Sequence, residues 1–411
     1  MRMFSVVALA ALSLAASVAS LPAAAEVKLA YIDPLSGGAA SAGINAQKHF
    51  LYEIDKINAA GGLNGEKLTI AFYDNKVDPQ ESLIALKKAL DEGARYIFQG
   101  NGSAVALALS DAILKYNERN PGKEVLYFNY AAIDPALTNA KCNFWHFRFD
   151  SDVDMKMAAL TDQIAKQAEV KKVYLINQDY SFGRAVAAAA RKMLAAKRPD
   201  IQIVGDELHP LQKVQDFSPY VAKIKASGAD TVITGNWSND MFLLLKAGKD
   251  AGLKVTWYTF YADALGAPTA IGRDGKDVVK VVTSYHTNVT PELDPDVVAF
   301  KQRFTGKEDE FNYYRLNTAF GMFAAAAAKA KSNDPVKVAR ALEGMKFMTS
   351  VGEVQMRADN HQLLQPLFVA TFTDHVKHDA EQTGLGFRTD ARIEAKDTAT
   401  PTTCQMQRPS P

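Results

Sequence analysis

The sequence predicts an α/β protein of two doubly wound, parallel-sheet lobes that are joined by several crossing strands. Short β-prone runs alternate with segments of helical periodicity along nearly the whole chain. Each predicted strand ends in a loop of small or polar residues, as at the ligand-binding edge of a parallel sheet. The alternation restarts after Phe149 without a Gly/Ser or Pro linker, which favours two lobes that hinge about a cleft.

The first 25 residues have the pattern of a secretory signal peptide. Arg2 precedes an apolar run over 6–18, and Ala23-Ala24-Ala25 places small residues before Glu26. We therefore expect cleavage after about Ala25. The alternative, an uncleaved anchor, is disfavoured because the run is shorter than a membrane span, and no later segment indicates membrane insertion.

Composition excludes some classes of partner. The formal net charge is +1, with 47 basic and 46 acidic residues, which argues against nucleic acid or an anionic membrane surface as a partner. The apolar share of 48% is ample for packed cores.

In a secreted chain, Cys142 and Cys404 are readable as a disulfide that holds the C-terminal tail, 391–411, on the body; two free thiols are the alternative.

The elements of the first lobe follow from local signals. The helix over 43–58 carries apolar residues at helical spacing and is stopped by Gly61-Gly62, and the helix over 79–92 begins with Pro79 and ends at Gly93. The expected strands of this lobe are 27–32, 68–73, 96–99 and 125–130.

The second half repeats the pattern. The expected elements are helix 152–167, strand 172–177, helix 181–196, strand 201–205, helix 216–225, strand 231–235, helix 239–251 and strand 255–260, followed by strand 278–283, helices 295–305, 313–330 and 335–342, and β-prone segments 350–356 and 366–372. Ser151 or Asp152 is expected to cap the first of these helices.

One stretch, 94–111, organises the predicted site. A strand ends at Gln99, a turn covers Gly100 to Gly102, and an Ala- and Leu-rich helix begins at Ser103. The free amides of the first helical turn, its partial positive charge and the Ser103 hydroxyl form an anion cradle. We expect a ligand carboxylate there.

Enzymatic and metal-binding interpretations of the sequence are weaker. The run from Gly100 to Val105 imitates a dinucleotide fingerprint, but Val105 replaces the third glycine, so an NAD-dependent enzyme is the least favoured class. No catalytic triad, zinc or phosphate-loop motif is present, so neither catalytic residues nor a cofactor are expected. The His146 region, the His375 and His378 pair and the spaced Asp150, Asp152 and Asp154 have simpler surface, hinge or capping interpretations.

Several ordered motifs resemble those of a known family. These motifs are Pro34-Leu35-Ser36-Gly37, the run over 54–65, Tyr73-Asp74-Asn75 with Asp78-Pro79, the run over 134–138, Phe182-Gly183, and Ala251-Gly252-Leu253-Lys254. Together they resemble the periplasmic solute-binding proteins of branched-chain-amino-acid-type (Leu/Ile/Val-binding-like) ABC importers, over residues 27 to about 372. The resemblance implies a periplasmic, monomeric protein of the type I periplasmic binding protein fold, which captures a small solute and passes it to an inner-membrane permease.

The resemblance also implies a division of the chain and a set of ligand contacts. Lobe 1 is expected to comprise 26–148 plus 284–350, and lobe 2 to comprise 149–283 plus 351–390. The carboxylate would be held by the loop of Gly102 and Ser103 and by the loop of Ala131, Ala132 and Ile133. The second lobe would contribute Phe182, Trp237 and the position of Tyr261.

Three departures from the family pattern direct the ligand prediction. Ile133 stands where a Thr is common, Phe182 where a Tyr is common, and Tyr261 where an acidic residue for the ligand ammonium is expected. Because a buried ammonium without a partner is strongly unfavourable, we predict a carboxylate that lacks the α-ammonium. Asp263 or Asp240 would restore the acid if the register differs by a residue or two, and this keeps branched-chain amino acids open.

The loops are rich in aromatic residues, which favours an aromatic acid or a short keto or fatty acid. The aromatic residues are Tyr130, Tyr180, Phe182, Trp237, Tyr258 and Tyr261. Tyr130 and Tyr258 lie on predicted strands, where core packing is the competing interpretation. A partner of a ligand-sensing membrane receptor would use the same fold and cleft.

Overall fold

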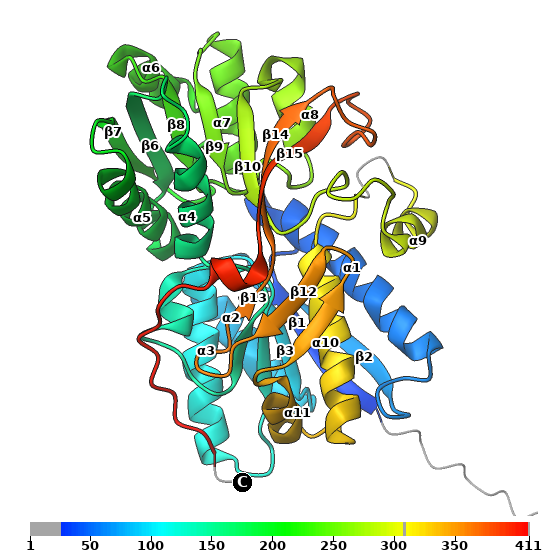
Figure 1. The fold of residues 1–411 in the computed structure, drawn as a ribbon. Helices are drawn as coiled ribbons and strands as arrows, with labels where there is room; N and C mark the ends of the chain where they lie inside the picture. Colours follow the sequence, from blue (N-terminus) through cyan, green and yellow to red (C-terminus); the bar gives the residue numbers. More distant parts are fainter. Residues whose placement is uncertain (1–25, 307–309, 410–411) are drawn as a thin grey trace, which may run out of the picture.

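Two lobes lie one above the other in the computed structural model, which describes residues 26–306 and 310–409 (Figure 1). Each lobe is built on its own sheet, and helices cover the sheets. The predicted class, an α/β protein with two parallel-sheet lobes, is confirmed. Met1 to Ala25, which carry the predicted signal peptide, lie outside the described residues.

The first lobe contains a five-stranded sheet in the order β2-β1-β3-β4-β5, and all of its neighbouring strands are parallel. Its strands are β1 (Glu26–Asp33), β2 (Lys67–Asp74), β3 (Tyr96–Gln99), β4 (Leu126–Asn129) and β5 (His146–Arg148). Its helices are α1 (Ala40–Ala59), α2 (Pro79–Asp91), α3 (Ser103–Arg119), α10 (Tyr314–Ala330) and α11 (Pro335–Leu342).

Apolar residues at the centre of this sheet explain its position. Phe98 of β3 lies between Tyr31 of β1 and Phe128 of β4 in the strand register, and all three side chains are fully buried. The ring of Phe320 on α10 stacks on Phe98 at a centroid distance of 5.2 Å. A helix from late in the chain therefore closes the core around strands from early in the chain.

The second lobe contains a seven-stranded sheet in the order β15-β14-β10-β9-β8-β6-β7. Strands β6 to β10 pair in parallel, whereas β14 and β15 join antiparallel. The strands are β6 (Lys172–Gln178), β7 (Gln202–His209), β8 (Thr231–Thr234), β9 (Thr256–Thr259), β10 (Val279–Thr283), β14 (Leu367–Thr373) and β15 (Gly386–Ile393). The antiparallel edge makes this sheet mixed rather than wholly parallel.

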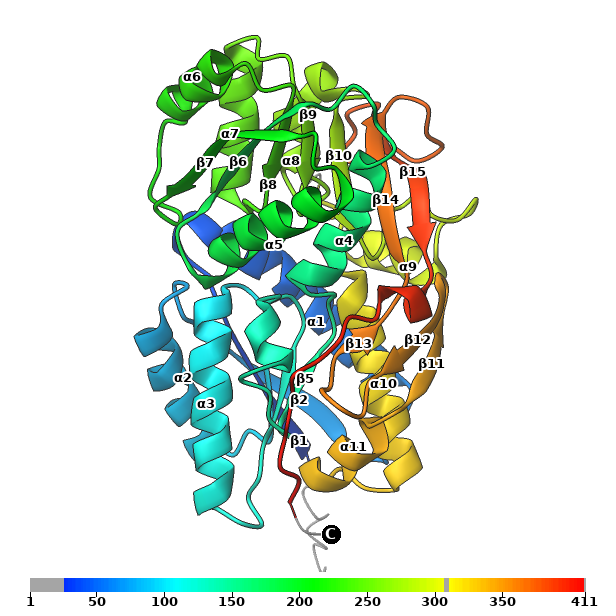
Figure 2. The ribbon, with the colours of Figure 1, turned by 60° about the vertical axis from the view of Figure 1, so that its left-hand side comes forward.

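Helices on both faces cover the second sheet (Figures 1 and 2). One further helix, over residues 295–303, lies beside the first lobe instead. The helices in this part of the chain are α4 (Val153–Ile164), α5 (Ser181–Lys197), α6 (Ser218–Ser227), α7 (Asn239–Asp250), α8 (Ala267–Ile271) and α9 (Pro295–Arg303). Asp152 caps α4, since its side chain accepts from the Met155 amide at 2.9 Å. Short 3-10 helices are η1 (Gly37–Ala39), η2 (Pro135–Thr138), η3 (Gly272–Gly275) and η4 (Ala395–Thr398).

A third, small sheet differs from the expected division of the chain. It consists of β11 (Lys346–Thr349), β12 (Gly352–Met356) and β13 (Leu363–Leu364). Val354, Met356 and Leu363 are buried with the core of the first lobe. The sequence-based division assigned 351–390 to lobe 2, but the part up to Leu363 packs on lobe 1 because these apolar side chains complete its core.

The C-terminal segment crosses from one lobe to the other. β15 lies in the second lobe, although it overlaps the start of the expected tail, and the chain after η4 runs along the first lobe (Figure 2). Cys142 and Cys404 form the predicted disulfide. Thr402 Oγ1 also donates to the carbonyl of Thr138 at 3.0 Å. The tail is therefore attached to lobe 1 by a covalent bond as well as by hydrogen bonds.

In residues 26–306 and 310–409, no helix combines the length and the apolar character needed to cross a membrane. The same residues contain no cluster of His, Cys, Asp or Glu suited to a metal ion. His146 is fully buried, its Nε2 lies 3.1 Å from the side-chain Nδ2 of Asn129, and burial lowers its pKa well below the usual value. The surface or hinge interpretation of His146 is therefore wrong, because the side chain is buried in the core.

Candidate ligand-binding site

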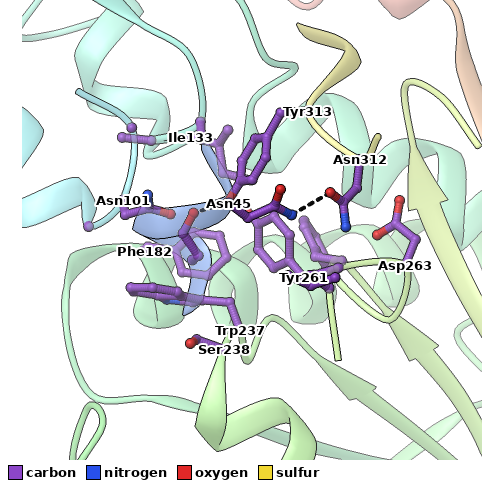
Figure 3. A pocket seen from close by; sticks show the side chains of 18 of the residues that line it. Asn45, Asn101, Ile133, Phe182, Trp237, Ser238, Tyr261, Asp263, Asn312 and Tyr313 are labelled. Atoms are coloured by element: carbon purple, nitrogen blue, oxygen red, sulfur yellow. Dashed lines mark hydrogen bonds between the residues drawn. The ribbon is translucent and has the colours of Figure 1, made fainter. Parts of the chain in front are cut away.

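A cavity lies between the two lobes at the strand ends. Figure 3 shows side chains from both lobes pointing into it. All eight residues that the sequence predicted as ligand contacts lie on its wall: Gly102, Ser103, Ala131, Ala132, Ile133, Phe182, Trp237 and Tyr261. Their contact with a solute stays a prediction.

The turn between β3 and α3 forms one side of the cavity. The buried carboxylate of Asp33, at the end of β1, accepts hydrogen bonds from the amides of Gly100 and Asn101 at 3.0 and 2.9 Å. Gly102 has φ +96°, and a Cβ there would lie 2.8 Å from Val77 Cγ1, so both the backbone and the space require glycine. This turn directs the first amides of α3 toward the cavity.

Ser103 is the first residue of α3, as the sequence predicts. Its Oγ accepts from the amide of Asp134 at 3.3 Å. The hydroxyl proton then remains available for an acceptor in the cavity. The helix start and this hydroxyl together fit a carboxylate.

Asp33 is fully buried beneath this turn. Burial raises its pKa to about 7, although hydrogen bonds from Tyr130 and from the Asn101 and Gly100 amides partly offset the effect. The Tyr130 hydroxyl donates to Asp33 at 2.5 Å. Tyr130 is thus a core residue that supports the turn, which is the competing interpretation of the sequence for this position.

The loop after β4 shapes the wall but offers fewer donors than the family resemblance implies. The amides of Ala131 and Ala132 both donate to Asn129 Oδ1, at 3.2 and 2.8 Å. The Asn129 side chain therefore occupies these two amides. Ile133 is buried and packs with the apolar cluster of the second lobe.

Aromatic rings from the second lobe form the opposite wall. Phe182 is the second residue of α5, and its ring centroid lies 6.2 Å from that of Tyr261. Trp237 Nε1 donates to the Tyr180 hydroxyl at 2.9 Å, which fixes the indole ring at the cavity. Four of the six aromatic residues singled out from the sequence line the cavity, whereas Tyr130 and Tyr258 do not.

Charged side chains meet next to Tyr261. Lys156 of α4 and Arg315 of α10 both line the cavity, and both approach the buried carboxylate of Asp150. Lys156 Nζ lies 3.1 Å from Asp150 Oδ1, and Arg315 Nη1 lies 3.5 Å from Oδ2. Asp150 thus joins a cation of lobe 1 to a cation of lobe 2 beside the hinge.

Asp263 adds a second carboxylate to this end of the cavity. Burial raises its pKa, and the charges of Arg315 and Lys156 act in the opposite direction. In Figure 3, Asp263 and Asn312 lie on the opposite side of the cavity from Asn101 and Ile133. The other acid considered from the sequence, Asp240, is not on the cavity wall and accepts from Gln178 Nε2 at 2.7 Å.

Several residues of the wall were not predicted from the sequence. The most prominent are Ser41, Asn45, Lys156, Ser238, Asn312, Tyr313 and Arg315. Their local sequence carries no motif: Lys156 is a lysine within an amphipathic helix, and Arg315 follows the first residue of α10. The one signal that could have indicated Lys156 is its position as a charged residue on the apolar face of the helix predicted over 152–167.

Direct contacts join the lobes at the cavity mouth. Ser238, before α7, donates to the carbonyl of Gly38 at 3.0 Å. Its Oγ also lies 3.4 Å from that of Ser41. Asn45 and Asn312 are linked by a hydrogen bond on the lobe 1 side (Figure 3). The structure therefore has the lobes in contact across the cavity.

Known proteins share this architecture. Residues 26–377 match the periplasmic binding protein family. The Leu/Ile/Val-binding protein homolog 4 of Brucella abortus (strain 2308) is 36% identical over 414 residues, covering 98% of this chain and 97% of that protein.

Solved structures agree with the sequence matches. A leucine-, isoleucine-, valine-, threonine- and alanine-binding protein from Brucella ovis, in a closed conformation, has a TM-score of 0.83 at 34% identity and covers 94% of this chain and 100% of its own. A solute-binding protein of an ABC transporter from Rhodopseudomonas palustris BisB5, in complex with 3,4-dihydroxybenzoic acid, shares the fold with a TM-score of 0.77 at 19% identity, covering 90% and 98% of the two chains. The chain belongs to the periplasmic binding protein family and is a substrate-binding protein of an ABC transporter, not an enzyme.

Proposed function

We propose that the protein captures a small carboxylate without an α-ammonium, an aromatic acid or a short keto or fatty acid, and passes it to an inner-membrane ABC permease. The observation that carries this proposal is the composition of the charged end of the cavity. Asp263 shares that end with Lys156 and Arg315, and a second carboxylate, Asp150, lies within 3.1 and 3.5 Å of the two cations.

The charges of these four groups balance when both carboxylates are ionised. An incoming ammonium would therefore meet no surplus negative charge, and two fixed cations would repel it. Burial also raises the pKa of Asp263, which weakens this residue as a counter-ion. The solute carboxylate, in contrast, has an uncharged cradle of amides and a hydroxyl at Ser103.

The aromatic wall favours the same class of solute. Phe182, Trp237 and Tyr261 offer flat apolar surfaces, and such surfaces bind a ring or an aliphatic body. The fold accommodates an aromatic acid in the Rhodopseudomonas protein. That likeness supports the proposal only at the level of the fold.

A branched-chain amino acid is the second candidate. Two observations favour it: Asp263 lies on the cavity wall, and the Brucella abortus relative carries the name Leu/Ile/Val-binding protein homolog 4. An α-ammonium next to Asp263 would require that Asp150 alone neutralise both Lys156 and Arg315.

The proposed mechanism is closure by population shift. A solute that contacts Ser103 on lobe 1 and the rings of Phe182 and Trp237 on lobe 2 has more contacts in the closed form than in the open form. The closed protein, a monomer in this proposal, then presents both lobes to the permease.

Thermal shifts of the mature protein test the proposal, after bound solute has been removed by unfolding and refolding. The panel contains leucine, valine, benzoate, phenylacetate, 4-methyl-2-oxopentanoate and hexanoate. A solute at a hundred times its Kd adds about 2.7 kcal/mol to the free energy of unfolding. Selective stabilisation by acids without an amino group supports the proposal, whereas stabilisation by leucine or valine selects the second candidate. If none of the six compounds raises the melting temperature, the search moves to amides, ureas and peptides.

A further inference from the structure

Lys156, which is buried, and Arg315, which is largely buried, are two cations on the cavity wall near Tyr261. Their side chains are 2% and 13% exposed. Lys156 Nζ lies 5.3 Å from the centroid of the Tyr261 ring, and the Arg315 guanidinium lies 4.7 Å from that of Tyr313. Rings that line the cavity therefore hold both cations in position.

The donors of these two side chains are not all used. An ammonium has three N–H groups and a guanidinium has five. Lys156 Nζ lies within 3.2 Å of both oxygens of Asp150, and Arg315 approaches the same carboxylate through Nη1. Among the residues that the structure describes, Arg315 Nε is buried without a hydrogen-bond partner.

A buried donor without an acceptor is costly, so the unpaired Nε marks Arg315 as a side chain whose hydrogen-bonding capacity is not fully used. The expected carboxylate cradle, at Gly102 and Ser103, lies on the wall of the same cavity. Asp263, which interacts with both cations, stands opposite Asn101 and Ile133, the neighbours of that cradle (Figure 3). A solute that spans the cavity from the cradle toward Asp263 would bring its far end to the carboxylate with which both cations interact.

We infer that Lys156 and Arg315 form a second subsite, which binds an oxygen acceptor at the end of the solute remote from its first carboxylate. The inference rests on the proposed function and narrows it to acids that carry an oxygen at both ends. A para-hydroxyl group, a distal carbonyl and a second carboxylate share this chemistry. Asp150 orients both cations, and Phe182 and Trp237 enclose the apolar body between the two ends.

Matched solutes test the inference by titration calorimetry. Benzoate is compared with 4-hydroxybenzoate and terephthalate, and hexanoate with adipate. On the wild-type protein, at least one oxygen-bearing solute should bind about tenfold or more tightly than its parent, because a hydrogen bond to a charged group contributes that much. The two series separate ring from chain, and 4-hydroxybenzoate and terephthalate separate a distal hydroxyl from a distal carboxylate.

Variants identify the residues responsible. Lys156→Met and Arg315→Lys should each bring the ratio of the affinity for the oxygen-bearing solute to the affinity for its parent acid close to one, whatever the change in the affinity for the parent acid. Arg315→Lys removes Nε but keeps a positive charge next to Asp150. The buried carboxylate therefore stays neutralised, and the fold should be retained. Lys166→Met, at an exposed lysine just after α4, is the control and should leave the preference unchanged. Circular dichroism verifies folding.

Four outcomes would overturn the inference. If the wild type binds parent and oxygen-bearing solutes equally well, the second subsite does not exist, and the proposed function is unaffected. A preference that survives both variants, or a uniform loss for all solutes, assigns the two cations to the hinge instead. Failure of every acid in the panel, with binding of leucine, overturns the proposed function together with the subsite.

Discussion

The hydroxyl of Ser238 donates to the carbonyl oxygen of Gly38 at 3.0 Å, and the two residues belong to different lobes. Ser238 has φ +54°, a backbone conformation that side chains with a Cβ rarely adopt. The position that joins the lobes is therefore also a strained one, and strain of this kind is commonly found at functional sites.

Ser238→Ala removes this hydrogen bond and should shift the ligand-free protein toward the open form. One hydrogen bond contributes about 0.5 to 1.5 kcal/mol, so affinity for the solute should fall about two- to tenfold. Small-angle scattering should show a larger radius of gyration. Ser227→Ala, which removes a bond to Ile224 within lobe 2, is the control and should change neither quantity. An unaltered radius for Ser238→Ala would mean that the contact does not hold the lobes together.

Ser103→Ala should weaken binding of a carboxylate by about 1 to 3 kcal/mol, because it removes one charge-assisted hydrogen bond. The fold should survive, since the helix start is held by Asp33 through the Gly100 and Asn101 amides. Calorimetry measures the affinity, and Ser103→Thr, which keeps the hydroxyl, is the matched control. Equal affinity in the alanine variant would show that the carboxylate lies elsewhere.

The Cys142–Cys404 disulfide joins residues 262 positions apart, so its loss frees a large loop in the unfolded state. The double variant Cys142→Ser/Cys404→Ser should be less stable by about 2 to 5 kcal/mol, as chain-entropy arguments predict for large loops. Urea unfolding with and without reductant measures the difference. Reductant should lower the stability of the wild type and leave the double variant unchanged; the same stability for both proteins would exclude a stabilising role.

Asp33 should make stability depend on pH. Burial raises its pKa to about 7 in the folded protein, above the ordinary value near 3.8 of the unfolded chain. The protonated form is thus favoured by folding, and this contribution is complete below about pH 4 and lost as the pH rises through 7. At about 1.4 kcal/mol per pKa unit, the effect is a few kcal/mol.

Urea unfolding of the wild type and of Asp33→Asn from pH 4 to 8 isolates this contribution. The unfolding free energy of the wild type minus that of Asp33→Asn should fall as the pH rises from 4 through 7, because only the wild type titrates at this position. A difference that stays constant over the range would contradict the raised pKa. Other titrating groups, such as the buried His146 and His286, cancel in the comparison.

Much of the fold followed from local sequence signals. The strand over 96–99 and the helix that begins at Ser103 have the predicted bounds, and Pro335 to Leu342 form the predicted helix. Apolar periodicity, prolines at helix starts and glycines at helix ends are properties of neighbouring residues, so the sequence alone contains them. Strands with weaker local patterns, such as β5 with its buried Arg148 and the charged edge strand β15, escaped prediction.

The sequence by itself determined the two-lobed class, the helix start at Ser103, the aromatic character of the second wall and the cysteine pair. Only the tertiary structure decided which charges share the cavity and which amides are free. Lys156 of α4 and Arg315 of α10, far apart in the chain, meet at Asp150, and Asn129 occupies the amides of Ala131 and Ala132. Desolvation and hydrogen-bond partners depend on residues far apart in the chain, and local periodicity carries no information about them.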